Sequence, residues 1–509
     1  MSETRTASGD LERRLETFRS VRETIETSIL PLATSVDGRT FAFQASLQGL
    51  ELQAGGYVVL EDAAGSRLGQ VLSLELADEE AAALEQPTAS AGEATARSRV
   101  LVRFARGRGT ILSGDGRPFH DALARPATAD EVSAWIGIGA RAPLVVGQLA
   151  LAPGVAHALD AGGFGRHTFL CGQSGSGKTY SLGVVLERLL LETTLRIVVL
   201  DPNSDYVRLT DVRSVVDPHT AARYAAVAEG IAVRRMIRLR VPDLDADQQA
   251  AVLRLDPIAD REEYAELAAA VAESRPGALR ELGRSERDEA RRLAQRAANL
   301  EVDRWPIWSE PGGDTLLDDL AGAGPRCVVV DLGALESRGE QALAAGAVLR
   351  ALWRRRAERE PLLVVIDEAH NICPQHPEGR LAALATEDAV RIAGEGRKFG
   401  LYLLLATQRP DKVHPNVLSQ CDNLVLMRMN SAADLSVVGE VFSFVPPGLL
   451  ERATTFRQGE ALVAGKISSH AALIRFGERI SEEGGADVPA TWLRAPSPRP
   501  GEGDSPQRR

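Results

Sequence analysis

Residues 169–179 read FLCGQSGSGKT, and this stretch decides the fold. Its apolar start predicts a buried strand, and a glycine-rich turn then leads into Lys178 and Thr179 at the start of a helix. Glycines let backbone N–H groups converge on phosphate oxygens, and the helix N-terminus adds the positive end of its dipole. The pattern G-x-x-x-x-G-K-T therefore predicts an ATP site, with Lys178 on the β- and γ-phosphates and Thr179 on Mg²⁺. The residues expected to bind the nucleotide are Gly172, Gln173, Ser174, Gly175, Ser176, Gly177, Lys178 and Thr179.

A second apolar run supplies carboxylates for the same site. Residues 362–370 read LLVVIDEAH, so Asp367 and Glu368 follow a buried strand, at the edge where open α/β sheets bind ligands. We expect Asp367 to hold Mg²⁺, directly or through water. We expect Glu368 to act as a general base or to polarise the attacking water. His370 either couples the nucleotide state to the neighbouring loop or is an ordinary loop residue.

Two polar residues end or interrupt later strands. Gln408 closes the run LLLATQ, where we favour a γ-phosphate sensor over a strand-terminal cap. Arg428 lies in the otherwise apolar run 424–429, and a guanidinium there needs a carboxylate or phosphate partner. Our hypothesis is an arginine finger that reaches a neighbouring subunit's γ-phosphate, with an internal salt bridge as the alternative. Arg397 and Lys398 are the rival candidates for that finger.

The length and composition of the chain limit the classes of protein to which it can belong. A chain of 509 residues predicts two or more domains. A net charge of −11 argues against a surface coated in basic residues, although a ring can still be locally basic in its pore. No apolar run is long enough to span a bilayer and the N-terminus is too polar for a signal peptide, so we expect a cytoplasmic protein without a membrane partner. Four widely spaced cysteines predict small core residues.

The N-terminal part differs in pattern from the rest. Residues 1–27 predict an amphipathic helix that either packs on a neighbour or frays. Short strands and glycine turns over 28–150 predict a small β-barrel. Within it, the Ala/Glu-rich stretch 78–97 is expected to be a loop or a short helix.

Residues 151–480 alternate buried strands with helices, which predicts a RecA-like α/β core with a parallel sheet. A mostly helical insertion interrupts the alternation at about 211–325. Residues 481–509 form a C-terminal extension, and its composition of Glu, Gly, Pro, Ser and Arg predicts that its end is disordered.

These motifs together resemble the HerA/FtsK superfamily of ring-forming DNA translocases, and HerA in particular. The resemblance extends over roughly 147–480 and is carried by GRHTFLCGQSGSGKT, VVLDPNSDY, LLVVIDEAHNICP, GRKFGLYLLLATQRP and QCDNLVLMRM. It implies a homohexameric ring around double-stranded DNA, with ATP and Mg²⁺ bound between subunits and translocation coupled to hydrolysis. It also implies a nuclease or other effector partner, in DNA end processing or phage defence.

One position departs from the pattern of that family. HerA-like proteins often carry Asp-x-x-Gly-Glu-Tyr after the second strand of the nucleotide domain. Here the segment runs from Asp201 to Tyr206 as DPNSDY, so Asp205 keeps the negative charge on a shorter side chain. Its role is therefore an open question at the level of sequence.

Two functions from different classes remain. The first is an ATP-hydrolysing, ring-forming translocase or helicase that acts on double-stranded DNA. The second is a nucleotide-switched hexameric scaffold that recruits and regulates an effector with little DNA translocation. The complete set of Lys178, Asp367, Glu368 and Gln408 favours hydrolysis.

Contacts to DNA are the least determined feature. Lys412, His414 and Arg208 are the candidates, because a ring concentrates a few basic residues per subunit at its pore. With an aromatic content of 5%, stacking of a single strand on interleaved aromatic side chains is disfavoured. Contact with the backbone of a duplex fits the composition better.

Overall fold

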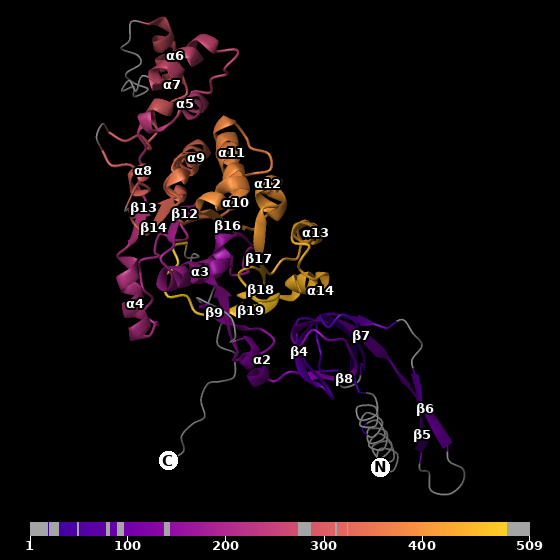
Figure 1. The fold of residues 1–509 in the computed structure, drawn as a ribbon. Helices are drawn as coiled ribbons and strands as arrows, with labels where there is room; N and C mark the ends of the chain where they lie inside the picture. Colours follow the sequence, from indigo (N-terminus) through magenta and orange to yellow (C-terminus); the bar gives the residue numbers. More distant parts are fainter. Residues whose placement is uncertain are drawn as a thin grey trace, which may run out of the picture.

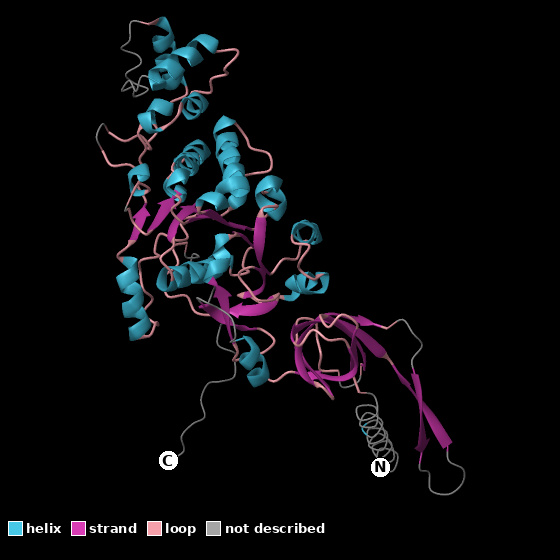
Figure 2. Ribbon diagram, viewed as in Figure 1, coloured by secondary structure: helices cyan, strands magenta, loops and turns pink. Residues whose placement is uncertain are grey.

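The computed structural model describes residues 19, 30–47, 50–77, 82–88, 96–136, 143–272, 287–310, 313–322 and 324–485 (Figure 1). The helix expected at 1–27 lies outside these residues except for Arg19, and so does the C-terminal extension after residue 485. A small β-barrel and a large α/β body follow one another along the chain (Figure 2). The fold class predicted from the sequence is confirmed, while the predicted domain boundaries stay a prediction.

The barrel is closed and has its own core. Phe41 and Phe43 alternate with exposed residues and point inward, as the sequence pattern indicates. Glycines make room for these rings, because a Cβ at Gly107 or Gly109 would lie 2.1 and 2.2 Å from a phenyl carbon. The strands, in barrel order, are β1 (Leu32–Ser35), β2 (Thr40–Ser46), β7 (Phe104–Ser113), β4 (Gly65–Leu76), β3 (Tyr57–Asp62) and β8 (Phe119–Pro126).

The Ala/Glu-rich stretch was predicted wrongly. Instead of a loop or short helix, it contains a two-stranded antiparallel ribbon of β5 (Ala82–Thr88) and β6 (Ala96–Val102). Ala and Glu favour helix in isolation, but propensity is a weak prior that pairing to a neighbouring strand overrides.

The α/β body is built on one sheet of eleven strands. Seven neighbouring strands, from β17 to β13, are parallel, and four antiparallel strands extend the sheet beyond β17. The parallel strands are nearly continuous apolar runs because helices cover both of their faces. In sheet order they are β10 (Ala156–Asp160), β9 (Pro143–Leu149), β19 (Ala472–Phe476), β18 (Glu460–Gly465), β17 (Cys421–Met427), β11 (His167–Cys171), β16 (Leu401–Thr407), β15 (Leu362–Ile366), β12 (Arg196–Asp201), β14 (Cys327–Asp331) and β13 (Ile231–Arg234).

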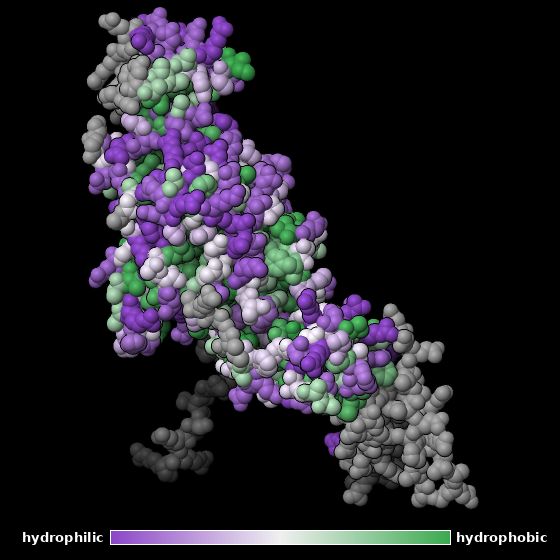
Figure 3. All heavy atoms as spheres, viewed as in Figure 1, coloured by the Kyte–Doolittle hydropathy of each residue, from purple (hydrophilic) through white to green (hydrophobic). Residues whose placement is uncertain are grey.

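Helices form a layer on each side of this sheet (Figure 1). On one side lie α3 (Lys178–Glu192) and α4 (Pro218–Ala228), which contact each other. The other side carries α9 (Arg338–Arg354), α10 (Ala369–Ile372), α11 (Arg380–Glu395) and α12 (Pro415–Leu418). Beside the sheet, α13 (Ala432–Val441) and α14 (Pro447–Leu450) form an area with apolar side chains at the surface (Figure 3). Among the described residues, none of the helices combines the length and the apolar character that crossing a membrane requires.

The predicted insertion is only partly a separate helical unit. Its compact part contains α5 (Ala246–Val252), α6 (Arg261–Ala272) and α7 (Asp288–Asn299), which lie beyond α9 and α11 in Figure 1. The short helix α8 (Leu316–Asp319) leads back to the sheet. Residues 218–234, in contrast, supply α4 and the edge strand β13, a strand that the sequence analysis did not predict. Arg350 on α9 connects the insertion to the body, because it forms ion pairs with Asp245 of the insertion and, at 2.7 Å, with Asp388 of α11.

Polar contacts join the barrel to the α/β body. Tyr57 Oη lies 2.8 Å from His470 Nε2, and Gln70 Nε2 donates to Ala471 O at 2.9 Å. His157 packs edge-on against His470 and is itself 2% exposed. Burial lowers the pKa of both histidines to about 4, so this junction holds neutral imidazoles.

Candidate nucleotide site

The strand order brings the predicted motifs to one edge. β11 lies between β16 and β17, and β15 is the next strand after β16. Because these strands are parallel, the segments that follow them meet at the same edge of the sheet. The expectation that Gln408 follows a strand beside the P-loop strand in a RecA-like order is confirmed.

The P-loop forms an open concave turn between β11 and α3. Gly175 and Gly177 have φ of 72° and 92°, a backbone conformation that glycine adopts without strain. Gln173 N donates to Arg428 O at 2.9 Å, and Gly459 N donates to Ser176 O at 2.9 Å, so two other segments hold the turn. Gly177 provides no side-chain cap for α3, which leaves its N-terminal amides to a ligand.

Lys178 bridges both carboxylates that follow β15. Its Nζ lies 2.5 Å from Asp367 Oδ1 and 3.0 Å from Glu368 Oε1. The lysine is only 5% exposed, and burial alone would lower its pKa. The two carboxylates instead raise the pKa of Lys178 above its ordinary value, so it stays charged. A charged lysine at this place suits the β- and γ-phosphates of a nucleotide.

Glu368 is held from three sides in an uncommon backbone conformation. Its φ is 44° and its ψ is 51°, the left-handed region that non-glycine residues rarely adopt. Gln408 Nε2 donates to Glu368 Oε1 at 3.0 Å, on the same oxygen that Lys178 approaches. His370 Nδ1 lies 3.2 Å from Glu368 Oε2 and 3.0 Å from Thr407 Oγ1. The structure therefore places His370 beside Glu368, and only its neighbourhood, not its role, is settled by this.

Besides Glu368 Oε2, which His370 Nδ1 approaches to 3.2 Å, two buried side-chain oxygens of the P-loop and of the residues after β15 have no hydrogen-bond partner among the described residues. They are Asp367 Oδ2 and Ser176 Oγ, in side chains that are both fully buried. A buried acceptor left without a partner is unfavourable, so both atoms fit a ligand that arrives with the nucleotide. Asp367 and Thr179 are oxygen donors of the kind that Mg²⁺ prefers, and they would hold it next to the phosphates.

Asp205 lies within this site. Its Oδ2 accepts a hydrogen bond from Thr179 Oγ1 at 3.4 Å. Burial, reinforced by the charge of Asp367, raises the pKa of Asp205 to about 6. The loop is shaped by Asp201, which accepts from the amides of Asp205 and Tyr206 at 3.0 and 2.8 Å. The shorter side chain noted in the sequence therefore still reaches the hydroxyl predicted to bind the metal.

A segment after β19, residues 477–485, packs along α3 and is here called the C-terminal strap. Arg479, which is 0% exposed, lies 3.6 Å from Glu187, and its backbone N donates to Tyr180 Oη at 2.7 Å. Further along, Gly484 N donates to Asp205 O at 3.0 Å. The strap thus connects the middle of α3 to the loop of Asp205. No sequence pattern predicts the strap, because one buried arginine within a polar segment has no recognisable signature.

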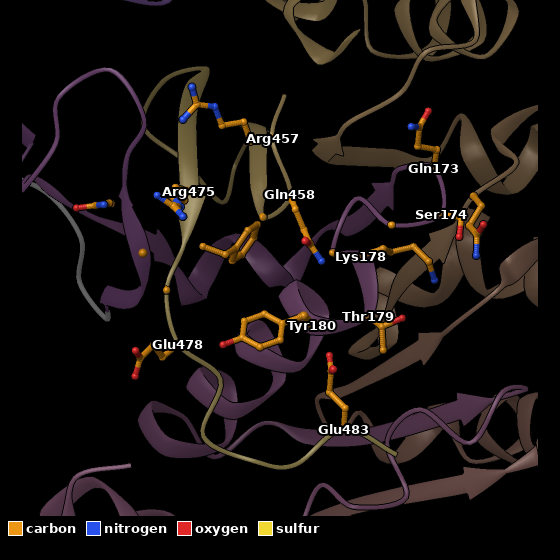
Figure 4. A pocket seen from close by; sticks show the side chains of 18 of the residues that line it. Gln173, Ser174, Lys178, Thr179, Tyr180, Arg457, Gln458, Arg475, Glu478 and Glu483 are labelled. Carbon is orange, nitrogen blue, oxygen red and sulfur yellow. The ribbon is translucent and has the colours of Figure 1, made fainter. Parts of the chain in front are cut away.

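These elements enclose a cleft of about 1140 Å³ (Figure 4). The side chains of Lys178, Thr179 and Tyr180, all on α3, line one side of the cleft. Gln458, which precedes β18, and Glu483 of the strap also face the cleft. The P-loop side of this cleft follows from the sequence motifs. The opposite wall was not predicted, and its residues are Gln148, Arg457, Gln458, Arg475, Glu478 and Glu483.

The predicted arginine-finger candidates have distinct positions. Arg428 Nη2 donates to Gly175 O of its own P-loop at 3.1 Å. Arg397 Nη1 instead pairs with Asp422 Oδ2 at 2.6 Å, and Lys398 lies in the same turn. That turn precedes β16, at the amino end of the strands and therefore away from this chain's own nucleotide edge.

Residues 144–352 match the family model described as the central domain of helicase HerA. Over these residues the chain is similar to HerA helicases. The chain is 24% identical over 403 residues to the DNA double-strand break repair helicase HerA of Pyrococcus furiosus. This alignment covers 65% of this chain and 68% of the relative. To the protein of the same name from Sulfolobus acidocaldarius it is 24% identical over 351 residues, or 65% of this chain and 69% of the relative.

Solved structures similar to this chain include VirB4 of Thermoanaerobacter pseudethanolicus. That likeness has a TM-score of 0.45 at 16% identity and covers 70% of this chain and 99% of the other. The bacterial conjugative coupling protein TrwB has a TM-score of 0.43 at 14% identity, and the likeness covers 69% of this chain and 92% of TrwB. At these scores the likeness adds no argument, and the RecA-like assignment rests on the strand order.

Proposed function

We propose that this chain hydrolyses ATP to move along double-stranded DNA as a translocase or helicase. The observation that carries hydrolysis is the contact of Glu368 with both Lys178 and Gln408 at the edge of the P-loop strand. The DNA substrate is supported by the names of the curated relatives, which are DNA repair helicases.

In this proposal each side chain at the nucleotide-binding edge of the sheet has one role. Lys178 turns from the carboxylates to the β- and γ-phosphates when ATP enters, because phosphate oxygens offer it more negative charge. That exchange frees Glu368 to accept the proton of the attacking water. Gln408 contacts Glu368 now and would orient the water or sense the γ-phosphate. Thr179 and Asp367 would hold Mg²⁺, which neutralises phosphate charge when bound.

We extend the proposal to a homohexameric ring in the cytoplasm. A nuclease or other effector would then act with the ring in DNA end processing or phage defence. These parts follow from the resemblance of the motifs. In the ring Arg428 would serve the neighbouring nucleotide, which requires its bond to Gly175 O to open. Arg397 and Lys398 remain the alternatives for that role.

The decisive experiment measures ATP turnover with and without duplex DNA. We expect DNA to stimulate the wild-type rate several-fold, and Glu368→Gln to lower turnover by about 10²–10⁴ while ATP binding persists. Turnover that is indifferent to DNA, with assembly still dependent on nucleotide, would instead favour the scaffold function. Native mass spectrometry with ATP tests the ring separately, and a strict monomer at high concentration would contradict it.

A further inference from the structure

A second cleft, of about 1490 Å³, shares Gln408 with the nucleotide cleft. One wall comes from the helical insertion around α5 and α6, and the other from the start of α9 and the segment that joins α10 to α11. Glu368, His370 and Gln408 line it as well. This cleft, here called the insertion cleft, therefore reaches the edge proposed to hydrolyse ATP.

Four arginines line the insertion cleft, and one of them, Arg380, pairs with Glu387 at 2.7 Å. The other three are Arg254 after α5, Arg338 at the start of α9 and Arg409 directly after Gln408. All three are exposed, and no carboxylate within the described residues forms an ion pair with any of them. Lys412 also lines the cleft but pairs with Asp411 at 3.1 Å.

The acidic side chains of the same cleft are mostly engaged by their own surroundings. Asp247 accepts the hydroxyl of Tyr264 at 2.8 Å. Asp256 caps the amides of Ile258 and Ala259 at 2.8 Å each. Glu368 faces Lys178. Glu378 is the exposed acid on the cleft wall for which no such partner is present in the described part of the chain.

This charge pattern selects a polyanion with negative charges spaced along its length. The arginines come from three elements of the cleft walls, so together they offer several cationic contacts to one extended anion. Among the described residues that line the cleft, Tyr264 is the one Phe, Tyr or Trp side chain, so the cleft has no series of such rings on which successive bases could stack. The face over α9 and α11 is predominantly hydrophilic (Figure 3), as expected where a charged backbone is contacted.

We propose that the insertion cleft binds the phosphodiester backbone of DNA, with Arg254, Arg338 and Arg409 as the phosphate contacts. The inference rests on the proposed function and locates where that DNA touches the subunit. A phosphate drawn to Arg409 acts on the residue next to Gln408, whose amide holds the Glu368 carboxylate. DNA bound in the insertion cleft thereby affects the position of Gln408 and Glu368, the residues proposed to hydrolyse ATP. This contact gives DNA a route to stimulate ATP turnover.

The test combines charge reversal with a matched control. In Arg254→Glu/Arg338→Glu we expect duplex affinity, measured by fluorescence anisotropy in the presence of ATPγS, to fall at least tenfold. The slope of log K against log salt should decrease by about two, since each phosphate contact contributes about 0.9. ATP turnover without DNA should stay within about twofold of wild type. The control, Arg39→Glu/Arg108→Glu, makes the same charge change on the exposed face of the barrel.

A variant that binds DNA more tightly distinguishes a changed contact from misfolding, because a misfolded protein would lose binding. Glu378→Lys should tighten duplex binding and steepen the salt slope by about one. Wild-type affinity and slope in both cleft variants would overturn the inference while leaving the proposed function intact. A wild-type protein that neither binds duplex DNA nor responds to it would overturn the proposed function itself. Unchanged DNA binding together with lost binding of a labelled polyglutamate peptide would reassign the cleft to an acidic protein partner.

Discussion

Helix α3 carries two buried ion pairs, and they differ in what surrounds them. At its first residue Lys178 meets Asp367 at 2.5 Å, and further along Glu187 meets Arg479 at 3.6 Å. Both pairs are almost completely shielded from water. Burial and opposite charge alone therefore do not distinguish them.

The distinction lies in the remaining polar atoms. Glu187 accepts hydrogen bonds from Ile480 N, Ser481 N and Ser481 Oγ, each at 2.7 Å, so its carboxylate is fully satisfied by the strap. At the other pair Asp367 Oδ2 has no partner in the described part of the chain, and a cleft opens beside Lys178. Arg479 Nη1 forms no hydrogen bond within the described residues but lies 3.5 Å from Glu483 Oε1. The pair whose carboxylate oxygens are all satisfied is therefore closed and holds the fold together, whereas the pair with an unsatisfied carboxylate oxygen at a cleft is open to a ligand.

The largest effect is expected at the open pair. Glu368→Gln keeps the shape of the side chain but removes the base, so ATP turnover should fall by about 10²–10⁴. The thermal unfolding midpoint should change little, because Gln can keep the contact to Gln408. Steady-state turnover and binding of a fluorescent ATP analogue check this. A variant with near wild-type turnover would remove Glu368 from the mechanism.

The closed pair should show the opposite profile. Arg479→Met leaves Glu187 buried without its cation and should lower the free energy of unfolding by about 3–5 kcal/mol. In the double variant Arg479→Met/Glu187→Gln part of that loss should be recovered, because the amide carries no buried charge and its oxygen still accepts from the strap. Urea unfolding of the single and double variants measures the difference. Equal stability of wild type and Arg479→Met would show that the strap contributes nothing to the fold.

A smaller effect is expected where the strap crosses α3. A Cβ at Gly183 would lie 2.6 Å from the guanidinium carbon of Arg479. Gly183→Ala should therefore destabilise by about 2 kcal/mol, despite the better helix propensity of alanine. Gly394→Ala on α11 is the control, since its Cβ would meet no atom within 4 Å. The comparison fails if both substitutions stabilise equally.

The smallest effect concerns a third buried polar group, the histidines at the junction of barrel and body. Their pKa of about 4 lies below the ordinary 6.5, so the unfolded chain binds more protons between these values. Stability should therefore decrease as the pH falls below 6.5, by about 1 kcal/mol per histidine at pH 5.5. Unfolding of wild type and His470→Gln at pH 7.5 and 5.5 measures this difference. An identical pH response of the two proteins would contradict it.

The parallel core was predictable because its strands are apolar on both faces and alternate with helices. The P-loop, the carboxylates after β15 and Gln408 followed from local patterns, and the strand order then brought them together. β13 was missed because four residues with partly exposed side chains give no strand signal. The strap and the direction of Arg428 depend on contacts between segments far apart in the sequence, which local patterns do not contain.

The pairing of β9 with β19 has a consequence for how the protein is made. Leu149 lies opposite Ile474, about 325 residues later in the chain. While the protein emerges from the ribosome, the barrel can close early, but β9 must wait for almost the whole α/β body before its partner exists. Pairing of the four antiparallel strands beyond β17 is therefore expected to be completed last and to be the slow step of folding, since contacts of such long sequence separation form late.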